Sequence, residues 1–263
     1  MKVSYLQMKP VFGTPGHNLE KVAGMMKGAP SDLWVLPELF TTGYLFTSRD
    51  ELQNLSEQIP EGRSTRFLTE LSRTYKTAIV AGLAERDGNE LYNSALYVKN
   101  GEFVGVYRKI HLFDREKLWF SPGNRSFEIY DLENIKMGIM ICYDWIYPEA
   151  ARSLALMGAD IICHPSNLVL PYCQDAMITR CLENRIFAVT ANRIGEENRG
   201  GVRLTFTGKS QITSPKGVVL RRGGYNTEEI GTVEINPMDA RSKQTTASNH
   251  IFDDRNPSKY NLS

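Results

Sequence analysis

Hydrophobic and polar positions follow two alternating patterns along the first three quarters of the chain. Short apolar runs, several with a period of two, predict strands, and apolar residues three or four positions apart predict helices. The strand patterns lie at 3–8, 33–36, 78–83, 91–98, 102–107, 127–131, 136–141, 160–163, 186–191, 209–213, 218–220 and 230–235. The helix patterns lie at 18–27, 64–75, 148–157 and 172–184. This alternation predicts an α/β protein whose strands have both parallel and antiparallel neighbours.

Finer signals locate helix ends, helix faces and turns within this pattern. Ser64 is the predicted N-cap of its helix, because a short hydroxyl side chain accepts a hydrogen bond from the first turn. Asn100-Gly101 predicts a hairpin turn before the strand at 102–107. The helix at 172–184 is predicted to turn four side chains inward, namely Met177, Ile178, Cys181 and Leu182.

The chain shows no repeat, low-complexity tract or Pro/Gly-rich linker that would divide it. We therefore expect a single domain over residues 1–263. Residues 237–263 are polar with isolated apolar positions, so we expect a C-terminal arm. Such an arm either packs on a neighbouring subunit or lies on its own surface.

Composition and charge narrow the class of partner. The formal net charge is +1, so neither nucleic acid nor an anionic membrane surface is an expected partner. No apolar stretch approaches the roughly 18 residues of a spanning helix, and the N-terminus lacks a signal-peptide pattern. The four cysteines form no CxxC pair, which suits a reducing compartment. We expect a cytoplasmic protein that acts on a small molecule.

One cysteine stands where a predicted strand gives way to a predicted helix. Cys142 follows the apolar run at 136–141, and Pro148 suits the first turn of the next helix. We expect a thiol on this turn to be exposed at the sheet edge, near the positive end of the helix dipole. Such surroundings favour the thiolate, which is the nucleophilic form. The alternative is an inert cysteine that serves as a small buried hydrophobe.

Two charged residues follow other predicted strands in the same manner. Glu38 lies past the strand at 33–36, and Lys109 past the strand at 102–107. Ligands bind beyond the carboxyl ends of strands in open α/β sheets. A shielded carboxyl there can accept a proton near neutral pH, and a lysine can stabilise a thiolate and later an oxyanion. Taken alone, each residue is more typical of a protein surface than of an active site.

Taken together and in this order, the three residues and their motifs resemble the nitrilase superfamily of carbon–nitrogen hydrolases. The matching motifs cover the chain from residue 1 to about residue 240. They are LPELF around Glu38, YRKIHLF around Lys109, FSPG ending at Gly123, ICYDWIYPE around Cys142, HPSN at His164–Asn167, and RCLENRIFAVTANRIG at Arg180–Gly195.

The resemblance implies a fold, an assembly and residue roles. The fold is a four-layer αββα sandwich with two mixed sheets face to face, and two subunits pair through helices into a homodimer or a higher homo-oligomer. Glu38 is implied as general base, Lys109 as oxyanion stabiliser and Cys142 as nucleophile. Glu116 matches a second glutamate that positions Lys109 and the substrate. The backbone N–H of Tyr143 is expected to complete the oxyanion site.

Side chains near predicted strand exits are candidates for the substrate pocket. They are Tyr44, Phe113, Trp145, Asn167 and Tyr172. The aromatic members are equally typical of core filling. Asn167 is the strongest candidate, because the resemblance places its turn beside the nucleophile.

No metal or other cofactor is expected. A zinc site would need Cys163, His164, Cys173 and Cys181, whose spacing lacks the tight pairs of such sites. His111, the nearest histidine to pair with Cys142, lies among apolar residues, and His164 is expected to brace a strand end.

The residues and the resemblance predict a thiol hydrolase. The leading expectation is cleavage of a small aliphatic amide to acid and ammonia through a thioester. Nitrile hydrolysis is the first alternative, although Cys142-Tyr-Asp departs from the Cys-Trp-Glu of many nitrilases. Hydrolysis of N-carbamoyl amines is another, and a non-catalytic binding protein on the same fold is an alternative of a different class.

Overall fold

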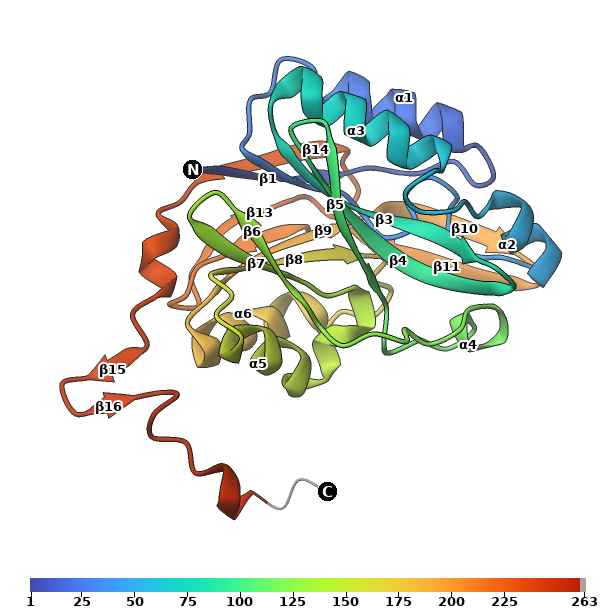
Figure 1. Cartoon of the computed structure of the whole chain (residues 1–263). Helices are drawn as coiled ribbons and strands as arrows, with labels where there is room; N and C mark the ends of the chain where they lie inside the picture. Colours follow the sequence, from blue (N-terminus) through green and yellow to red (C-terminus); the bar gives the residue numbers. More distant parts are fainter. Residues whose placement is uncertain (261–263) are drawn as a thin grey trace.

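Two six-stranded sheets lie face to face in the computed structural model, which describes residues 1–260 (Figure 1). The first sheet has the order β14-β1-β2-β3-β4-β5, with bounds Glu229–Glu234, Lys2–Gln7, Leu33–Val35, Ala78–Asp87, Glu90–Lys99 and Glu102–Arg108. The second has the order β13-β12-β9-β8-β7-β6, with bounds Val219–Arg222, Gln211–Thr213, Phe187–Asn192, Ile161–Ser166, Ile135–Ile139 and Ile129–Leu132. Both sheets mix parallel and antiparallel pairs, as the sequence predicts.

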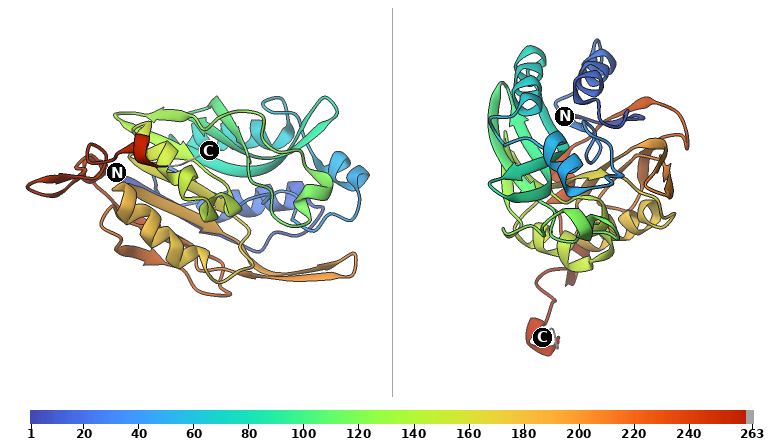
Figure 2. Two further views of the ribbon diagram at one scale, coloured as in Figure 1. Left: turned by 90° about the horizontal axis from the view of Figure 1, so that it is seen from below. Right: turned by 90° about the vertical axis from the view of Figure 1, so that its right-hand side faces the viewer.

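Helices cover the outer face of each sheet. The helices α1 (Pro15–Met26) and α3 (Arg63–Tyr75) lie on the first sheet. The helices α5 (Pro148–Leu156) and α6 (Cys173–Asn184) lie on the second, which Figure 2 shows from two further sides. The four layers confirm the predicted αββα sandwich.

Period-two alternation along the first sheet builds two hydrophobic cores. On β2, Val35 belongs to the core between the sheets, whereas Trp34 belongs to the core under α1 and α3. On β1, Tyr5 belongs to the core between the sheets and Leu6 to the core under the two helices. Strands buried on both faces are therefore apolar at nearly every position, and this explains why the sequence pattern locates them well.

Two helix details differ from the sequence prediction. The helix α3 begins at Arg63, and its first N–H groups are bound by Glu57, whose carboxylate accepts from the backbone N of Ser64 and of Thr65. Ser64 is therefore not the N-cap. Leu182 of α6 is 47% exposed, because it lies one position past the buried stripe that contains Cys181.

Several elements carry no clear hydrophobic period and were not predicted. They are α2 (Arg49–Leu55), α4 (Glu116–Trp119), the short 3₁₀ helix η1 (Cys142–Ile146) and the hairpin of β10 (Ile194–Arg199) with β11 (Val202–Thr207). Within the described residues 1–260 the two strands of the hairpin pair only with each other, so they have no sheet neighbour that would impose an apolar period.

Residues 237–260 leave the sandwich as a separate segment (Figure 1). Its elements are η2 (Pro237–Ala240), β15 (Gln244–Thr246), β16 (Asn249–His250) and η3 (Pro257–Lys259). Lys243 Nζ attaches its first part to the body by donating to Asn184 O at 3.0 Å and Arg185 O at 2.8 Å. These carbonyls end α6, where a cation is favoured by the helix dipole.

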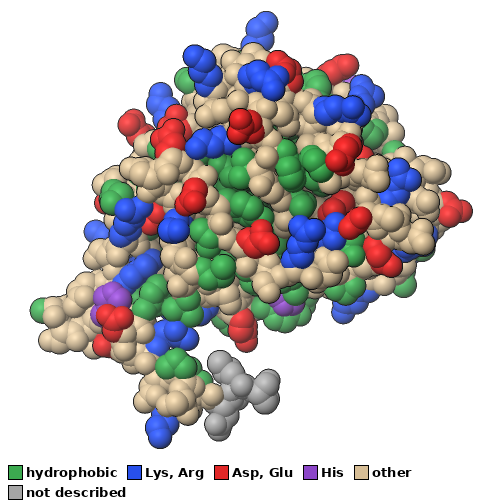
Figure 3. All heavy atoms as spheres, viewed as in Figure 1, with side chains coloured by type: hydrophobic (Ala, Val, Ile, Leu, Met, Phe, Trp, Pro, Cys, Tyr) green, Lys and Arg blue, Asp and Glu red, His purple; other side chains and the backbone are tan. Residues whose placement is uncertain are grey.

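The surface carries charges of both signs. Figure 3 shows Lys and Arg interspersed with Asp and Glu on the face seen in Figure 1, in keeping with the net charge of +1. Within residues 1–260, no helix has the length and apolar character that crossing a bilayer requires.

Candidate active site

Three strand exits bring charged and nucleophilic side chains to one place between the sheets. Glu38 follows β2, Lys109 follows β5, and Cys142 follows β7. Lys109 Nζ lies 2.7 Å from Glu38 Oε1 and 2.8 Å from Glu116 Oε1. All four side chains are almost completely buried. The structure therefore assembles the residues that the sequence placed at separate strand ends.

Two glycines allow backbone segments to approach closely at this site. A Cβ at Gly82 of β3 would lie 2.4 Å from the Cα of Glu38. A Cβ at Gly123 would lie 2.2 Å from Arg108 O, and the Gly123 N–H donates to Lys109 O at 2.8 Å. The glycine that ends the FSPG motif thus fixes the backbone of Lys109. A side chain at either position would displace a catalytic candidate.

The two oxygens of Glu38 have different surroundings. Oε1 accepts from Lys109 Nζ and, at 2.6 Å, from Asn93 Nδ2. Oε2 is buried and has no hydrogen-bond partner among residues 1–260. A carboxylate held through one oxygen, with the other free, is arranged to accept a proton.

Cys142 adopts a strained conformation at the start of η1. Its φ is +42°, a left-handed value that a non-glycine residue rarely adopts, and such strain is concentrated at functional sites. Only 5% of the residue is exposed, so the expected exposed position at the sheet edge is wrong. The tight turn does place the thiol directly at the end of the strand.

The thiol is neutral in the resting protein. Burial raises the pKa of Cys142 well above its ordinary value, and the negative charge of Glu38 raises it further. Lys109 acts in the opposite direction but does not outweigh them. The predicted thiolate is therefore wrong, because burial between the two sheets is the largest influence on the pKa of this thiol. A nucleophile in this state needs a base.

Lys109 remains an ammonium ion despite its burial. Desolvation lowers its pKa, but the charges of Glu116 and Glu38 outweigh that effect, and the pKa lies above its ordinary value. Burial raises the pKa of Glu116, and Lys109 opposes that rise. One cation thus stabilises two buried carboxylates.

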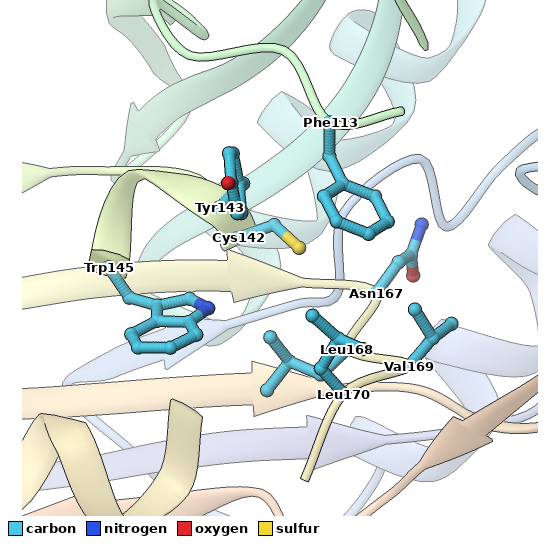
Figure 4. A pocket seen from close by; sticks show the side chains of 8 residues that line it. All are labelled: Phe113, Cys142, Tyr143, Trp145, Asn167, Leu168, Val169 and Leu170. Atoms are coloured by element: carbon cyan, nitrogen blue, oxygen red, sulfur yellow. The ribbon is translucent and has the colours of Figure 1, made fainter. Parts of the chain in front are cut away.

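A small, mainly apolar pocket opens onto Cys142 (Figure 4). Its lining residues are Phe113, Cys142, Tyr143, Trp145, Asn167, Leu168, Val169 and Leu170. Asn167 is 2% exposed, and within the described part of the chain neither atom of its side-chain amide has a hydrogen-bond partner. An orphaned buried amide beside a nucleophile is suited to bind a polar group of a ligand.

The structure divides the other predicted pocket residues. Phe113, Tyr143 and Trp145 line the pocket. Tyr44 instead donates from its hydroxyl to Glu116 Oε1 at 2.7 Å, so it touches the charged cluster. Tyr172 is 63% exposed at the start of α6 and is not among the lining residues, so that prediction is wrong.

Sequence reasoning missed Asn93 and Asp144. Asn93 lies on β4, is fully buried and donates to Glu38, and the signal available in the sequence was an amide side chain within a mainly apolar strand pattern. The Asp144 carboxylate accepts from Ile141 N and Tyr107 OH, both at 2.8 Å, and contacts His111 Nδ1 at 2.7 Å. It therefore ties the segment after β5 to the turn that carries the nucleophile.

His164 braces the opposite side of this turn. Its Nε2 lies 2.9 Å from Cys142 O, and its Nδ1 lies 3.1 Å from the hydroxyl of Thr190. Burial lowers the pKa of His164 to about 4, so the ring is neutral at physiological pH. Among the described residues, no group of three or more His, Cys, Asp and Glu side chains is arranged to hold a metal ion.

Comparison with known proteins agrees with this geometry. The chain matches the family model described as carbon-nitrogen hydrolase over residues 2–244. It is 49% identical over 263 residues to a protein of Pyrococcus abyssi named nitrilase, with 99% of each chain covered. It is 32% identical over 263 residues to a 2-oxoglutaramate amidase of Bacillus subtilis, with 96% of each chain covered. A solved carbon-nitrogen hydrolase from Helicobacter pylori G27 superposes with a TM-score of 0.84 at 28% identity, covering 92% of this chain and 90% of that one. This chain therefore belongs to the carbon–nitrogen hydrolase family, within the nitrilase superfamily.

Proposed function

We propose that this carbon–nitrogen hydrolase converts a small, uncharged aliphatic amide to acid and ammonia through a thioester on Cys142. The observation that carries the proposal is the ion pair of Lys109 with Glu38, which leaves Glu38 Oε2 free in the same buried cluster as a neutral thiol. The arrangement supplies a base, a cation and a nucleophile within one buried cluster.

The first half of the reaction forms the thioester. Glu38 takes the proton from the Cys142 thiol as the sulfur attacks the amide carbon. Negative charge develops on the carbonyl oxygen, where Lys109 and the Tyr143 N–H stabilise it. Loss of one such donor typically slows a reaction by ~10²–10³. Glu38 then passes its proton to the nitrogen, the C–N bond breaks, and ammonia leaves.

The second half returns the free enzyme. Glu38 takes a proton from a water molecule, and the resulting hydroxide attacks the thioester carbon. Lys109 again stabilises the oxyanion. The carbon–sulfur bond breaks, the acid is released, and Glu38 returns its proton to the Cys142 sulfur. The net reaction converts the amide and one water molecule to the acid and ammonia.

The pocket lining supports an uncharged acyl group. Its side chains are aromatic, aliphatic or neutral amide, apart from the thiol itself. Neither a Lys or Arg that would bind an anionic substrate nor an Asp or Glu that would bind a cationic one is among these lining residues.

Nitrile hydrolysis is the second candidate, favoured by the relative named nitrilase that is 49% identical over nearly the whole chain. The same cluster would add Cys142 to the nitrile carbon, giving a thioimidate. One water would then release ammonia and a second would release the acid. The two candidates share the nucleophile and differ in the first adduct.

A substrate panel tests the proposal. Purified protein is incubated with propionamide, propionitrile and N-carbamoyl-propylamine, and ammonia is measured for the wild type and for Cys142→Ala. We expect ammonia from propionamide in the wild type and none from Cys142→Ala. Ammonia from propionitrile alone would select the second candidate. Release of no ammonia from any class would refute the enzymatic reading and favour a binding protein.

A further inference from the structure

The β10–β11 hairpin holds the segment that carries Tyr44. The two carboxylate oxygens of Glu197, on β10, each lie 3.1 Å from the backbone N of Tyr44, and one also accepts from the N–H of Leu45 at 2.7 Å. Arg199 of the same strand donates to Leu45 O at 2.8 Å. Two side chains of β10 therefore hydrogen-bond to the backbone N–H groups of Tyr44 and Leu45 and to the carbonyl of Leu45.

Glu197 is itself fixed and buried. It is 6% exposed and forms an ion pair with Arg193, whose guanidinium lies 3.9 Å above the ring of Phe206. The same ring packs edge-on against Tyr44, with 6.0 Å between centroids. A Cβ at Gly43, where φ is +85°, would lie 3.0 Å from Glu197 Oε1. The backbone at Gly43 thus packs directly against the Glu197 carboxylate, and the ring of Tyr44 packs against Phe206 of β11.

The other end of Tyr44 reaches the charged cluster. Its hydroxyl donates to Glu116 Oε1, and Lys109 Nζ donates to that same oxygen. Glu116 Oε2 accepts from the Phe113 N–H at 3.1 Å. Glu116 Oε1 therefore accepts from both the Tyr44 hydroxyl and Lys109, so a displaced hydroxyl would change the hydrogen bonding of this carboxylate.

We propose that Glu197 is a positioning residue for the reaction, acting through Tyr44 on Glu116 and Lys109. This inference rests on the proposed function. A charged carboxylate that accepts two adjacent backbone N–H groups makes stronger hydrogen bonds than a neutral acceptor does. It fixes the start of a side chain whose far end must remain within hydrogen-bond distance of Glu116. Small displacements of catalytic groups are costly, on the order of 10²-fold for about 1 Å.

A double-mutant cycle tests the coupling. The variants are Glu197→Gln, which turns one acceptor oxygen into a donor facing the same N–H groups, Tyr44→Phe, and the combination. The matched control is Glu196→Gln, one residue earlier, whose carboxylate pairs with exposed Arg203. We expect each single variant to lower kcat about 10-fold with KM nearly unchanged, and the double variant to lose no more than the worse single. Glu196→Gln should match the wild type.

The pH profile separates positioning from general stability. Glu116 is faced by Lys109, Glu38 and the Tyr44 hydroxyl, and the hydroxyl favours the ionised form of Glu116. Losing that hydrogen bond should move the acidic limb of kcat/KM to higher pH in both Tyr44→Phe and Glu197→Gln. A variant that only lowers the melting temperature would leave the acidic limb of kcat/KM at the wild-type pH. Glu197→Asp, which keeps the charge, should recover part of the rate.

A second readout does not depend on turnover. The rate at which iodoacetamide alkylates Cys142, followed by intact-protein mass, should fall in Tyr44→Phe and Glu197→Gln without adding up in the double variant. Additive losses, or Glu197→Gln alkylating as fast as the wild type, would overturn the inference even if the wild type hydrolyses amides. If the wild type hydrolyses nothing, the proposed function fails, and the alkylation cycle still decides the coupling.

Discussion

Lys109 and Glu38 form an ion pair, 2.7 Å from Nζ to Oε1, in which neither side chain is exposed to solvent. Glu116 binds the same ammonium group at 2.8 Å, so one buried cation balances two buried carboxylates. Such a cluster is expensive to desolvate, and an apolar replacement of the same volume is often more stable. Its presence beyond the ends of β2 and β5 is therefore better explained by chemistry than by stability.

Replacing Lys109 by Met should remove both catalysis and a large part of the stability. The two carboxylates would remain buried without a cation, which typically costs about 3–5 kcal/mol. Urea unfolding measures the loss of stability, and ammonia release from propionamide should fall by at least ~10². Lys117→Met changes an exposed lysine eight residues further along and serves as control. Equal unfolding midpoints and equal activity in the two variants would refute the role of Lys109.

Replacing Asn93 by Ala should weaken catalysis through Glu38. The variant removes the 2.6 Å hydrogen bond from Asn93 to Glu38 Oε1, and Lys109 Nζ still donates to that oxygen. We expect kcat/KM for propionamide to fall about 10-fold and the free energy of unfolding to fall by about 1–3 kcal/mol. Asn89→Ala, in the exposed turn between β3 and β4, should change neither quantity. An Asn93→Ala enzyme with wild-type kcat/KM would show that Glu38 needs no second donor.

The buried neutral state of His164 should appear as a stability loss in acid. Its pKa is lowered from 6.5 to about 4, so the unfolded chain binds the proton more readily than the folded protein does. The contribution is therefore complete above pH 6.5 and is lost as the pH falls toward 4, by about 3 kcal/mol. His164→Asn should show a shallower fall of unfolding free energy across this window. Parallel curves for the two proteins would contradict the assignment.

Trp145 should limit the length of the acyl group. It lines the pocket beside Cys142, so Trp145→Ala should improve kcat/KM for hexanamide relative to propionamide by about 10-fold. Tyr172→Ala is the control, because Tyr172 is exposed and is not a lining residue. An unchanged ratio in Trp145→Ala, or an equal change in both variants, would place the length limit elsewhere.

The sequence predicts the strands of the two six-stranded sheets and the three strand-end residues, because both depend on local pattern. Strands such as β2 are apolar on both faces, and the residue after them is readily identified. Contacts between distant segments are less accessible: Asn93 lies 55 positions from Glu38, and Glu197 lies 153 positions from Tyr44. The neutral state of Cys142 also depends on burial between two sheets, which a local dipole argument does not include. Tyr172 follows β8, the strand that also precedes Asn167, but its side chain is exposed to solvent.

Formation of a thioester on Cys142 is the central claim, and intact-protein mass after rapid quenching tests it most directly. Wild type, Cys142→Ala and Glu38→Gln are each mixed with propionamide and quenched in acid within the first turnover. We predict that the wild type gains the mass of one propionyl group in place of one hydrogen, and that peptide mapping places it on Cys142. Both variants should gain nothing. Ammonia release with no acyl adduct in the wild type, or an adduct on Cys142→Ala, would contradict the account.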